Sequence, residues 1–173
     1  MANAPSSTAR HPGQTLARVI GALFLVIGIL GFIPGITGQY DQMQFAGQGS
    51  GAMLFGLFQV SVLHNLVHIA IGLAGLTMAR TLGGARAFLI GAGIITLALW
   101  LYGWVVDNAS NANFVPMNTA DNWLHLILGT GMVALGVAAT STRREAAGVP
   151  TDTTRRTGGT TGTFRPTGPG GSI

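Results

Sequence analysis

Four long apolar stretches limit what this chain can fold into more than any other feature of its sequence. They cover residues 16–36, 54–79, 87–106 and 121–140, and each has roughly the 20 residues that a helix needs to cross the hydrocarbon core. Only 8% of the 173 residues are charged, against about a quarter in a soluble protein. We therefore predict an all-α integral membrane protein, a bundle of four transmembrane helices.

The two ends of the chain differ in composition from its middle. Residues 1–15 and 141–173 are rich in Thr, Gly, Pro, Ser and Arg, so they bury too little apolar surface to offset the entropy lost on ordering. We predict that both are disordered tails of a transmembrane domain that covers residues 16–140. A signal peptide is the alternative for the first stretch, but the apolar run is long and no Ala-x-Ala cleavage site closes it.

The basic residues indicate the orientation of the chain, because cytoplasmic loops hold an excess of Lys and Arg. All nine flank the same ends of the four stretches: Arg10, Arg18, Arg80, Arg86, Arg143, Arg144, Arg155, Arg156 and Arg165. The opposite loops, 37–53 and 107–120, contain none. We predict that both termini are cytoplasmic. Because the arginines flank apolar spans and form no recognition motif, we expect the lipid bilayer, and not nucleic acid, as their partner.

Small residues recur within the apolar stretches. Helices in lipid pack closely only where small side chains let their backbones approach. The sequence offers such positions at Gly28, Gly31, Gly35, Gly72, Gly75, Gly129 and Gly136. These glycines predict a tightly packed bundle, and their faces also suit self-association or the helix of another membrane protein.

A short pattern, Asn-x-x-His-x-x-x-Gly, occurs in two of the stretches. It comprises Asn65, His68 and Gly72 in the second stretch and Asn122, His125 and Gly129 in the fourth. Arg18 and Arg86, which open the first and third stretches, fit the same relation. The pattern predicts a tandem duplication of a two-helix hairpin about an axis along the membrane normal. Chance recurrence in Gly-rich spans is the alternative.

Polar side chains inside the stretches are the candidate functional residues, because such groups are rare in membranes and face the protein interior. They are His64, Asn65, His68, Asn122 and His125. Counted from the basic flank at about 1.5 Å per residue, His64 and His125 lie at similar depth and His68 roughly 6–9 Å deeper. This spacing argues against a direct pairing of His68 with His125. We expect Asp41, Asp107 and Asp121 to rim an acidic outer mouth above the cluster.

We predict that the chain is a structural or accessory membrane subunit without enzymatic activity or cofactor, in which the polar side chains hydrogen-bond between helices. A second and a third function remain open as alternatives. In the second, His64, His68 and His125 bind haem or a transition metal, because neutral imidazoles suit zinc, copper and iron. In the third, the aspartates attract cations to a small transporter or channel. The sequence has no cysteine and none of the common signatures of hydrolases, nucleotide-binding enzymes or zinc proteases.

Several segments are similar to one protein family. They are RVIGALFLVIGILGFIPGIT, LFGLFQVSVLHNLVHIAIGLAGL, WLYGWVVD and NFVPMNTADNWLHLILGTGM, taken from the first to the fourth stretch. Together they resemble the family of domain of unknown function 4383, bacterial membrane proteins found mainly in actinobacteria, over residues 16–140. The resemblance implies four spans in a bacterial plasma membrane and no established activity, so it transfers no catalytic residue.

Overall fold

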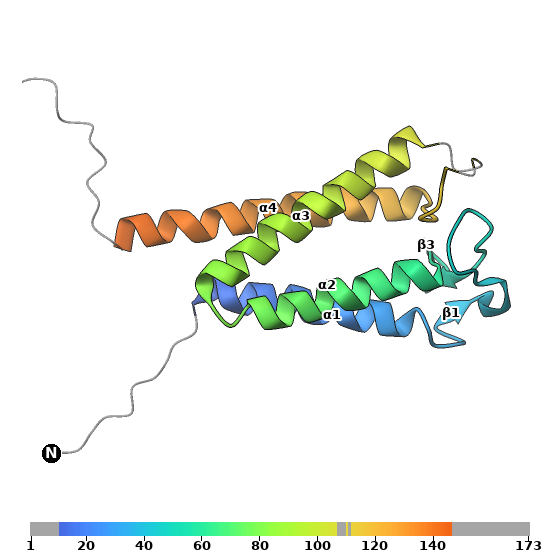
Figure 1. Cartoon of the computed structure of the whole chain (residues 1–173), viewed down its shortest axis with the longest axis horizontal. Helices are drawn as coiled ribbons and strands as arrows, with labels where there is room; N and C mark the ends of the chain where they lie inside the picture. The colour runs from blue at the N-terminus through green and yellow to red at the C-terminus, as the bar shows by residue number, and fades with distance from the viewer. Residues whose placement is uncertain (1–10, 107–109, 111, 147–173) are drawn as a thin grey trace, which may run out of the picture.

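The computed structural model describes residues 11–106, 110 and 112–146, with side chains up to residue 139. These residues form four α-helices: α1 (Pro12–Leu30), α2 (Val62–Met78), α3 (Leu82–Val105) and α4 (Thr119–Ala146). α1 packs antiparallel to α2, and α3 antiparallel to α4 (Figure 1). We call α1, α2 and the segment between them the first hairpin, and α3, α4 and their connection the second hairpin. The helices α1 and α3 and the Thr119–Ala139 part of α4 are long and apolar enough to cross a membrane.

A small antiparallel sheet lies at one end of the first hairpin, and we call this end of the molecule the sheet end (Figure 1). Its strands are β1 (Thr37–Gly38), β2 (Met53–Leu54) and β3 (Phe58–Gln59), in the order β1-β2-β3, and a 3-10 helix, η1 (Tyr40–Gln42), follows β1. Leu54 pairs with Thr37 on one side and with Phe58 on the other. Because Leu54 also packs against apolar residues near the end of α1, the sheet is fixed to the helices.

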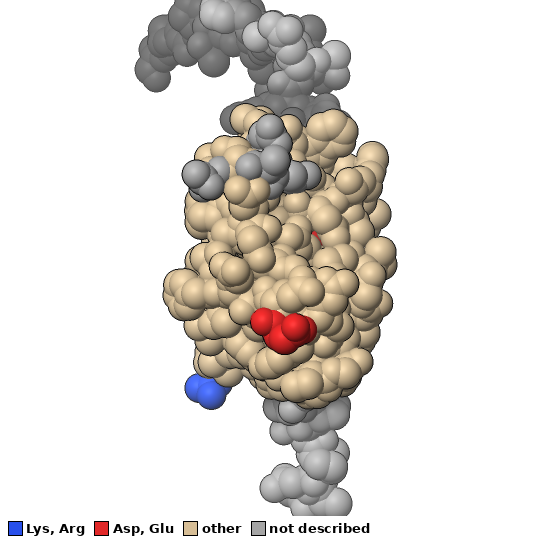
Figure 2. Space-filling view, turned by 90° about the vertical axis from the view of Figure 1, so that its right-hand side faces the viewer, with Lys and Arg blue, Asp and Glu red and all other residues tan. Residues whose placement is uncertain are grey.

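Charged groups are distributed unevenly between the two ends. Arg18, Arg80 and Arg86 lie near the beginnings of α1 and α3, opposite the sheet end. Figure 2 looks onto the sheet end, where the described residues in view are mostly uncharged, with a prominent acidic group facing the viewer and a basic group at the margin. The described residues therefore keep the charge asymmetry that the sequence shows.

The sides of the helices expose large apolar side chains. On α1 they follow one another at intervals of three or four residues: Leu16, Val19, Leu23, Val26 and Ile29. This spacing places them on one stripe of the helix. α3 and α4 also expose large apolar side chains: Ile94, Ile95, Leu101, Ile127 and Val137. Apolar surface of this extent is typical of a membrane contact.

Side-chain caps fix where α2 and α4 begin. The Ser61 hydroxyl accepts a hydrogen bond from the His64 amide at 3.2 Å. Asn118 and Asp121 cap α4 reciprocally, since the side chain of each accepts a hydrogen bond from the backbone amide of the other, both at 3.0 Å. These caps position the first two turns of both helices, which carry the histidines.

The prediction that the second apolar stretch, 54–79, forms a single helix was wrong. Its first residues form β2, a turn and β3, and α2 begins only at Val62. Phe55 and Gly56 have positive φ angles of 55° and 69°, so the chain reverses direction there. α2 is consequently shorter than the other three helices.

The first stretch, 16–36, is also displaced from its helix. α1 ends at Leu30, and Gly35 lies in the turn that follows, with a φ angle of 92° and no neighbour that a side chain would meet. The prediction that Gly35 packs between helices was therefore wrong, because its left-handed backbone serves a turn that glycine adopts at low cost.

The helices extend into both predicted tails. α1 begins at Pro12, inside the tail predicted for 1–15, because proline suits the first helical position and the His11 side chain caps the helix. α4 continues to Ala146, inside the tail predicted for 141–173. Residues 1–10 and 147–173 of the predicted tails lie outside the described residues, and so does Asp107.

The two hairpins make equivalent helix contacts. In the first, Gly31 faces Asn65, Gly72 faces Leu25, and Gly21 faces Gly75. In the second, Gly103 faces Asn122, Gly129 faces Leu97, and Gly93 faces Met132. Residue numbers therefore shift by 72 from α1 to α3 (Gly31 to Gly103) and by 57 from α2 to α4 (Asn65 to Asn122). In this register Arg18 corresponds to Ile90, so the predicted equivalence of Arg18 and Arg86 was wrong.

Candidate functional site

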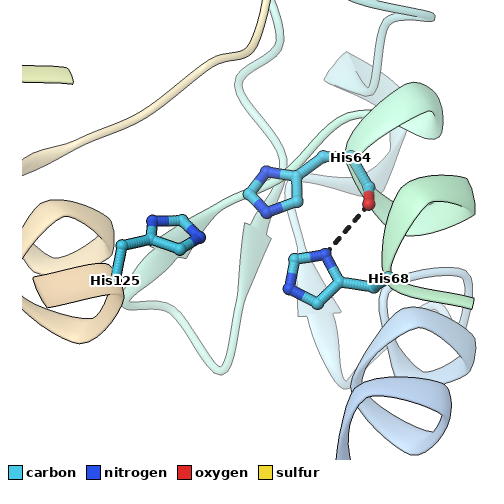
Figure 3. A group of neighbouring side chains, drawn as sticks. All are labelled: His64, His68 and His125. Atoms are coloured by element: carbon cyan, nitrogen blue, oxygen red, sulfur yellow. Dashed lines mark hydrogen bonds between the residues drawn. The ribbon is translucent and has the colours of Figure 1, made fainter. Parts of the chain in front are cut away.

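Three histidines meet between the two hairpins near the sheet end. His64 and His68 lie on successive turns of α2, and His125 lies near the beginning of α4. The ring centroids of His64 and His68 are 4.6 Å apart, and those of His64 and His125 are 6.1 Å apart, with the ring planes inclined by 27° and 26°. The three rings face a common space (Figure 3). One potential ligand nitrogen from each lies within 4.8 Å of the other two.

The hydrogen bond of His68 decides which of its two ring nitrogens is free to bind a ligand. Its Nδ1 lies 3.0 Å from the backbone carbonyl oxygen of His64 (Figure 3). A carbonyl only accepts, so Nδ1 carries the proton and Nε2 keeps its lone pair in the neutral ring. A ring fixed in this way by a carbonyl is the usual state of a metal-binding histidine.

The other two rings are more deeply buried and less satisfied. His64 and His125 are 6% and 4% exposed, and the Nδ1 atom of each is buried without a hydrogen-bond partner. Leaving a buried polar atom unpaired is costly. In the part of the chain that the structure describes, no hydrogen bond joins one of the three rings to another.

Asp121 forms part of the wall beside the histidines and is buried, 3% exposed. Its Oδ2 accepts hydrogen bonds from the amides of Gln59 and Asn118, both at 3.0 Å, and thereby links β3 to the first turn of α4. Asp41, by contrast, is exposed on η1. The structure therefore does not bring these two aspartates together at an open mouth.

The two asparagines of the predicted cluster lie at equivalent helix contacts but differ in their hydrogen bonds. The Asn122 Nδ2 donates to the Gly103 carbonyl oxygen at 3.0 Å. Asn65 lies against Gly31 in the equivalent place, and its Nδ2 is buried without a partner. Asn65 also lines the space beside the histidines, whereas Asn122 does not.

The predicted packing glycines other than Gly35 lie in helix contacts. Gly28 faces Ile69 and the Asn65 backbone, Gly75 faces Phe88 and Gly21, and Gly136 faces Leu89 and Ile90, in addition to the contacts of Gly31, Gly72 and Gly129 given above. A side chain at any of these positions would meet atoms of the neighbouring helix at close range. They act by bringing the helices of each hairpin close together.

A cavity of about 60 Å³ lies next to the histidines. Its polar lining comprises His64, Asn65, His68, Asp121 and His125, and its apolar walls include Leu23, Phe24, Phe55 and Leu124. The Phe24 ring lies 5.3 Å from that of His68. Sequence reasoning did not find these apolar residues, because an apolar side chain in an apolar helix gives no signal, and Phe55 lies in a turn that was predicted as helix.

The comparisons with known proteins identify a family and nothing more specific. The model of a family described as a domain of unknown function, DUF4383, matches residues 14–138. No curated protein and no solved structure matches the chain. The family match covers both hairpins and the whole histidine cluster, so the chain belongs to the DUF4383 family.

Proposed function

We propose that the chain is a four-span protein of the bacterial plasma membrane that binds a transition metal ion through His64, His68 and His125. The observation that carries the proposal is the convergence of three imidazoles from two helices, with ligand nitrogens within 4.8 Å of one another. Neutral imidazole is a common ligand of zinc, copper and iron.

The four-span arrangement is supported by the course of the chain. α1 and α3 are each long enough to cross a membrane, and they begin at the same end of the molecule (Figure 1). The chain therefore has to return between them, and the 17 residues of α2 span about 26 Å. Arg18, Arg80 and Arg86 all lie at the end where α1 begins, which favours cytoplasmic termini.

The equivalent helix contacts support a tandem duplication as part of the same proposal. Under the shift of 57 residues from α2 to α4, His68 corresponds to His125, and Ser61 corresponds to Asn118 as the helix cap. His64 corresponds to Asp121. The metal site then lies between two related helix starts, each of which supplies a polar residue and, one turn later, a histidine.

The size of the site favours a metal ion over haem. Tetrahedral zinc binds imidazole nitrogens at 2.0–2.1 Å, which places the nitrogens about 3.4 Å from one another. The ligand nitrogens of the three rings lie within 4.8 Å of one another, so small rotations of the rings would bring them to this distance. A cavity of about 60 Å³ has no room for a porphyrin.

An accessory or structural role for the bundle is the competing function. It would use the histidines to join helices, but no hydrogen bond of the described structure joins two of these rings, and two Nδ1 atoms are unpaired. A metal would use lone pairs that the protein otherwise leaves buried, at a cost in free energy.

The test is metal analysis of detergent-purified protein after equilibration with Zn²⁺ or Cu⁺. We expect about one metal ion per chain, lost in His64→Ala, His68→Ala and His125→Ala. His11→Ser is the control, because it removes the histidine that caps α1 and leaves a residue that can cap a helix. Wild-type protein that takes up no more metal than the triple alanine variant would contradict the proposal and leave the accessory role.

A further inference from the structure

The cavity beside the histidines has an apolar rim. Leu23 on α1, Phe55 in the turn between β2 and β3, and Leu124 on α4 all line it, yet they are 48%, 59% and 38% exposed. The polar lining residues His64, Asn65, Asp121 and His125 are buried. The cavity therefore opens to the surface past three apolar side chains and has its polar groups at the bottom.

This rim lies on a surface suited to lipid. Leu23 belongs to the exposed apolar stripe of α1, between Val19 and Val26, and Leu124 lies one turn from the exposed Ile127 on α4. No residue of α3 lines the cavity. In a four-span protein the opening faces sideways into the bilayer, between α1 and α4 and beneath the β2–β3 turn.

The backbone at the rim is unusual. Phe55 has a φ angle of 55°, a left-handed conformation that bulky residues rarely adopt, and Gly56 follows with 69°. The turn that requires this conformation also places Phe55 at the opening. Backbone strain of this kind is concentrated at ligand sites in proteins.

The size of the cavity limits what it can hold. It measures about 60 Å³, whereas an engineered apolar cavity that binds benzene measures about 150 Å³. An ion would lose its hydration in passing an apolar rim set in lipid, so this route does not suit the metal ion itself. A ligand that enters past the rim has to be small, neutral and soluble in hydrocarbon.

From these observations we propose that the cavity admits a small, neutral, hydrocarbon-soluble molecule from the bilayer, through the opening between α1 and α4, to the rings of His64 and His125. Dioxygen has these properties and serves as the probe. This proposal rests on the proposed function in one respect only: a metal ion held by His64, His68 and His125 would be the group that such a molecule reaches. Entry into the cavity itself requires no metal.

The test uses metal-free protein in lipid nanodiscs with isotope-labelled histidine. Dissolved dioxygen is paramagnetic, so a ring within its reach relaxes faster in the NMR spectrum as the oxygen pressure rises. We expect this enhancement at His64 and His125 in the wild type, its loss in Leu124→Trp, which fills the rim, and its retention in Ile127→Trp. Ile127 is 70% exposed on the same helix and does not line the cavity.

Equal enhancement in Leu124→Trp and Ile127→Trp would overturn entry through this opening. No enhancement at either ring in the wild type would overturn the admission of dioxygen altogether. Failure of metal uptake refutes only the metal site, whereas failure of the relaxation experiment refutes only access to the cavity from the bilayer.

Discussion

The two hairpins share their packing contacts and differ where the cavity lies. Gly31 and Gly103 each face an asparagine of the neighbouring helix, yet among the described residues only the connection of the first hairpin carries a sheet. α1 lines the cavity and α3 does not. Where the hairpins agree, the residues hold helices together. Where they differ, the first hairpin supplies most of the cavity lining, and the second supplies four residues of α4, among them Asp121 and His125.

The position of His64 and Asp121 shows the difference most clearly. Both residues lie at the third helical position after a capping side chain, and their amides donate to Ser61 and Asn118. The Asp121 carboxylate is occupied by two backbone amides, whereas the His64 Nδ1 is unpaired. One hairpin therefore uses this position for structure, and the other leaves it available for a ligand.

We expect the largest loss of stability from substitutions that disrupt the helix contacts common to both hairpins. Gly72→Leu and Gly129→Leu would each force a side chain into the neighbouring helix, at Leu25 and at Leu97. We expect each to lower the free energy of unfolding by about 3 kcal/mol, the upper part of the range for overpacking. Unfolding of purified protein in mixed micelles measures the effect.

Gly91→Leu is the matched control, because no atom lies near a side chain at Gly91. It should unfold like the wild type. If only one of Gly72→Leu and Gly129→Leu loses stability, the equivalent contacts of the two hairpins do not contribute equally to the free energy of unfolding.

A smaller effect would sharpen the contrast between Asp121 and His64. Asp121→Leu leaves the amides of Gln59 and Asn118 without their acceptor, and we expect a loss of about 2 kcal/mol. His64→Leu, measured in metal-free protein, should change stability by less than about 1 kcal/mol, because it removes a side chain whose Nδ1 is already unpaired.

Asp121→Asn keeps an acceptor oxygen and should recover most of the stability lost in Asp121→Leu. A metal-free His64→Leu variant as unstable as Asp121→Leu would show that His64 is also a structural residue.

The smallest effect concerns the two asparagines. Asn122→Leu removes the hydrogen bond to the Gly103 carbonyl oxygen, and polar contacts between membrane helices contribute about 0.6 kcal/mol on average. Asn65→Leu removes a side chain whose Nδ2 has no partner, so it should leave the unfolding midpoint nearly unchanged. Equal losses in the two variants would contradict this difference.

The helices were predictable from hydropathy, and their ends were not. Residues 54–61 are apolar enough to read as the start of a span, yet Phe55 and Gly56 turn the chain and Ser61 starts the helix later. Local turn and cap geometry overrode the apolar pattern. The glycine contacts were largely foreseeable, because close approach in lipid requires small residues.

The meeting of the histidines was only partly predictable. His64 and His68 follow from helical spacing, but the depth of His125 was counted from the basic flank, and α4 runs past Ala139 before its described end at Ala146. Counted from the caps, His68 follows Ser61 and His125 follows Asn118 by the same interval. The caps at the sheet end, not the arginines, set the depth of the site.

Asp121 also has a consequence for biosynthesis. The Gln59 amide is part of the first hairpin, but the carboxylate that satisfies it arrives only with α4. A ribosome releases the first hairpin earlier, so the sheet cannot reach its final hydrogen bonding until the last helix has been inserted. A chain that stops before α4 therefore leaves the Gln59 amide without the acceptor that it has in the finished protein.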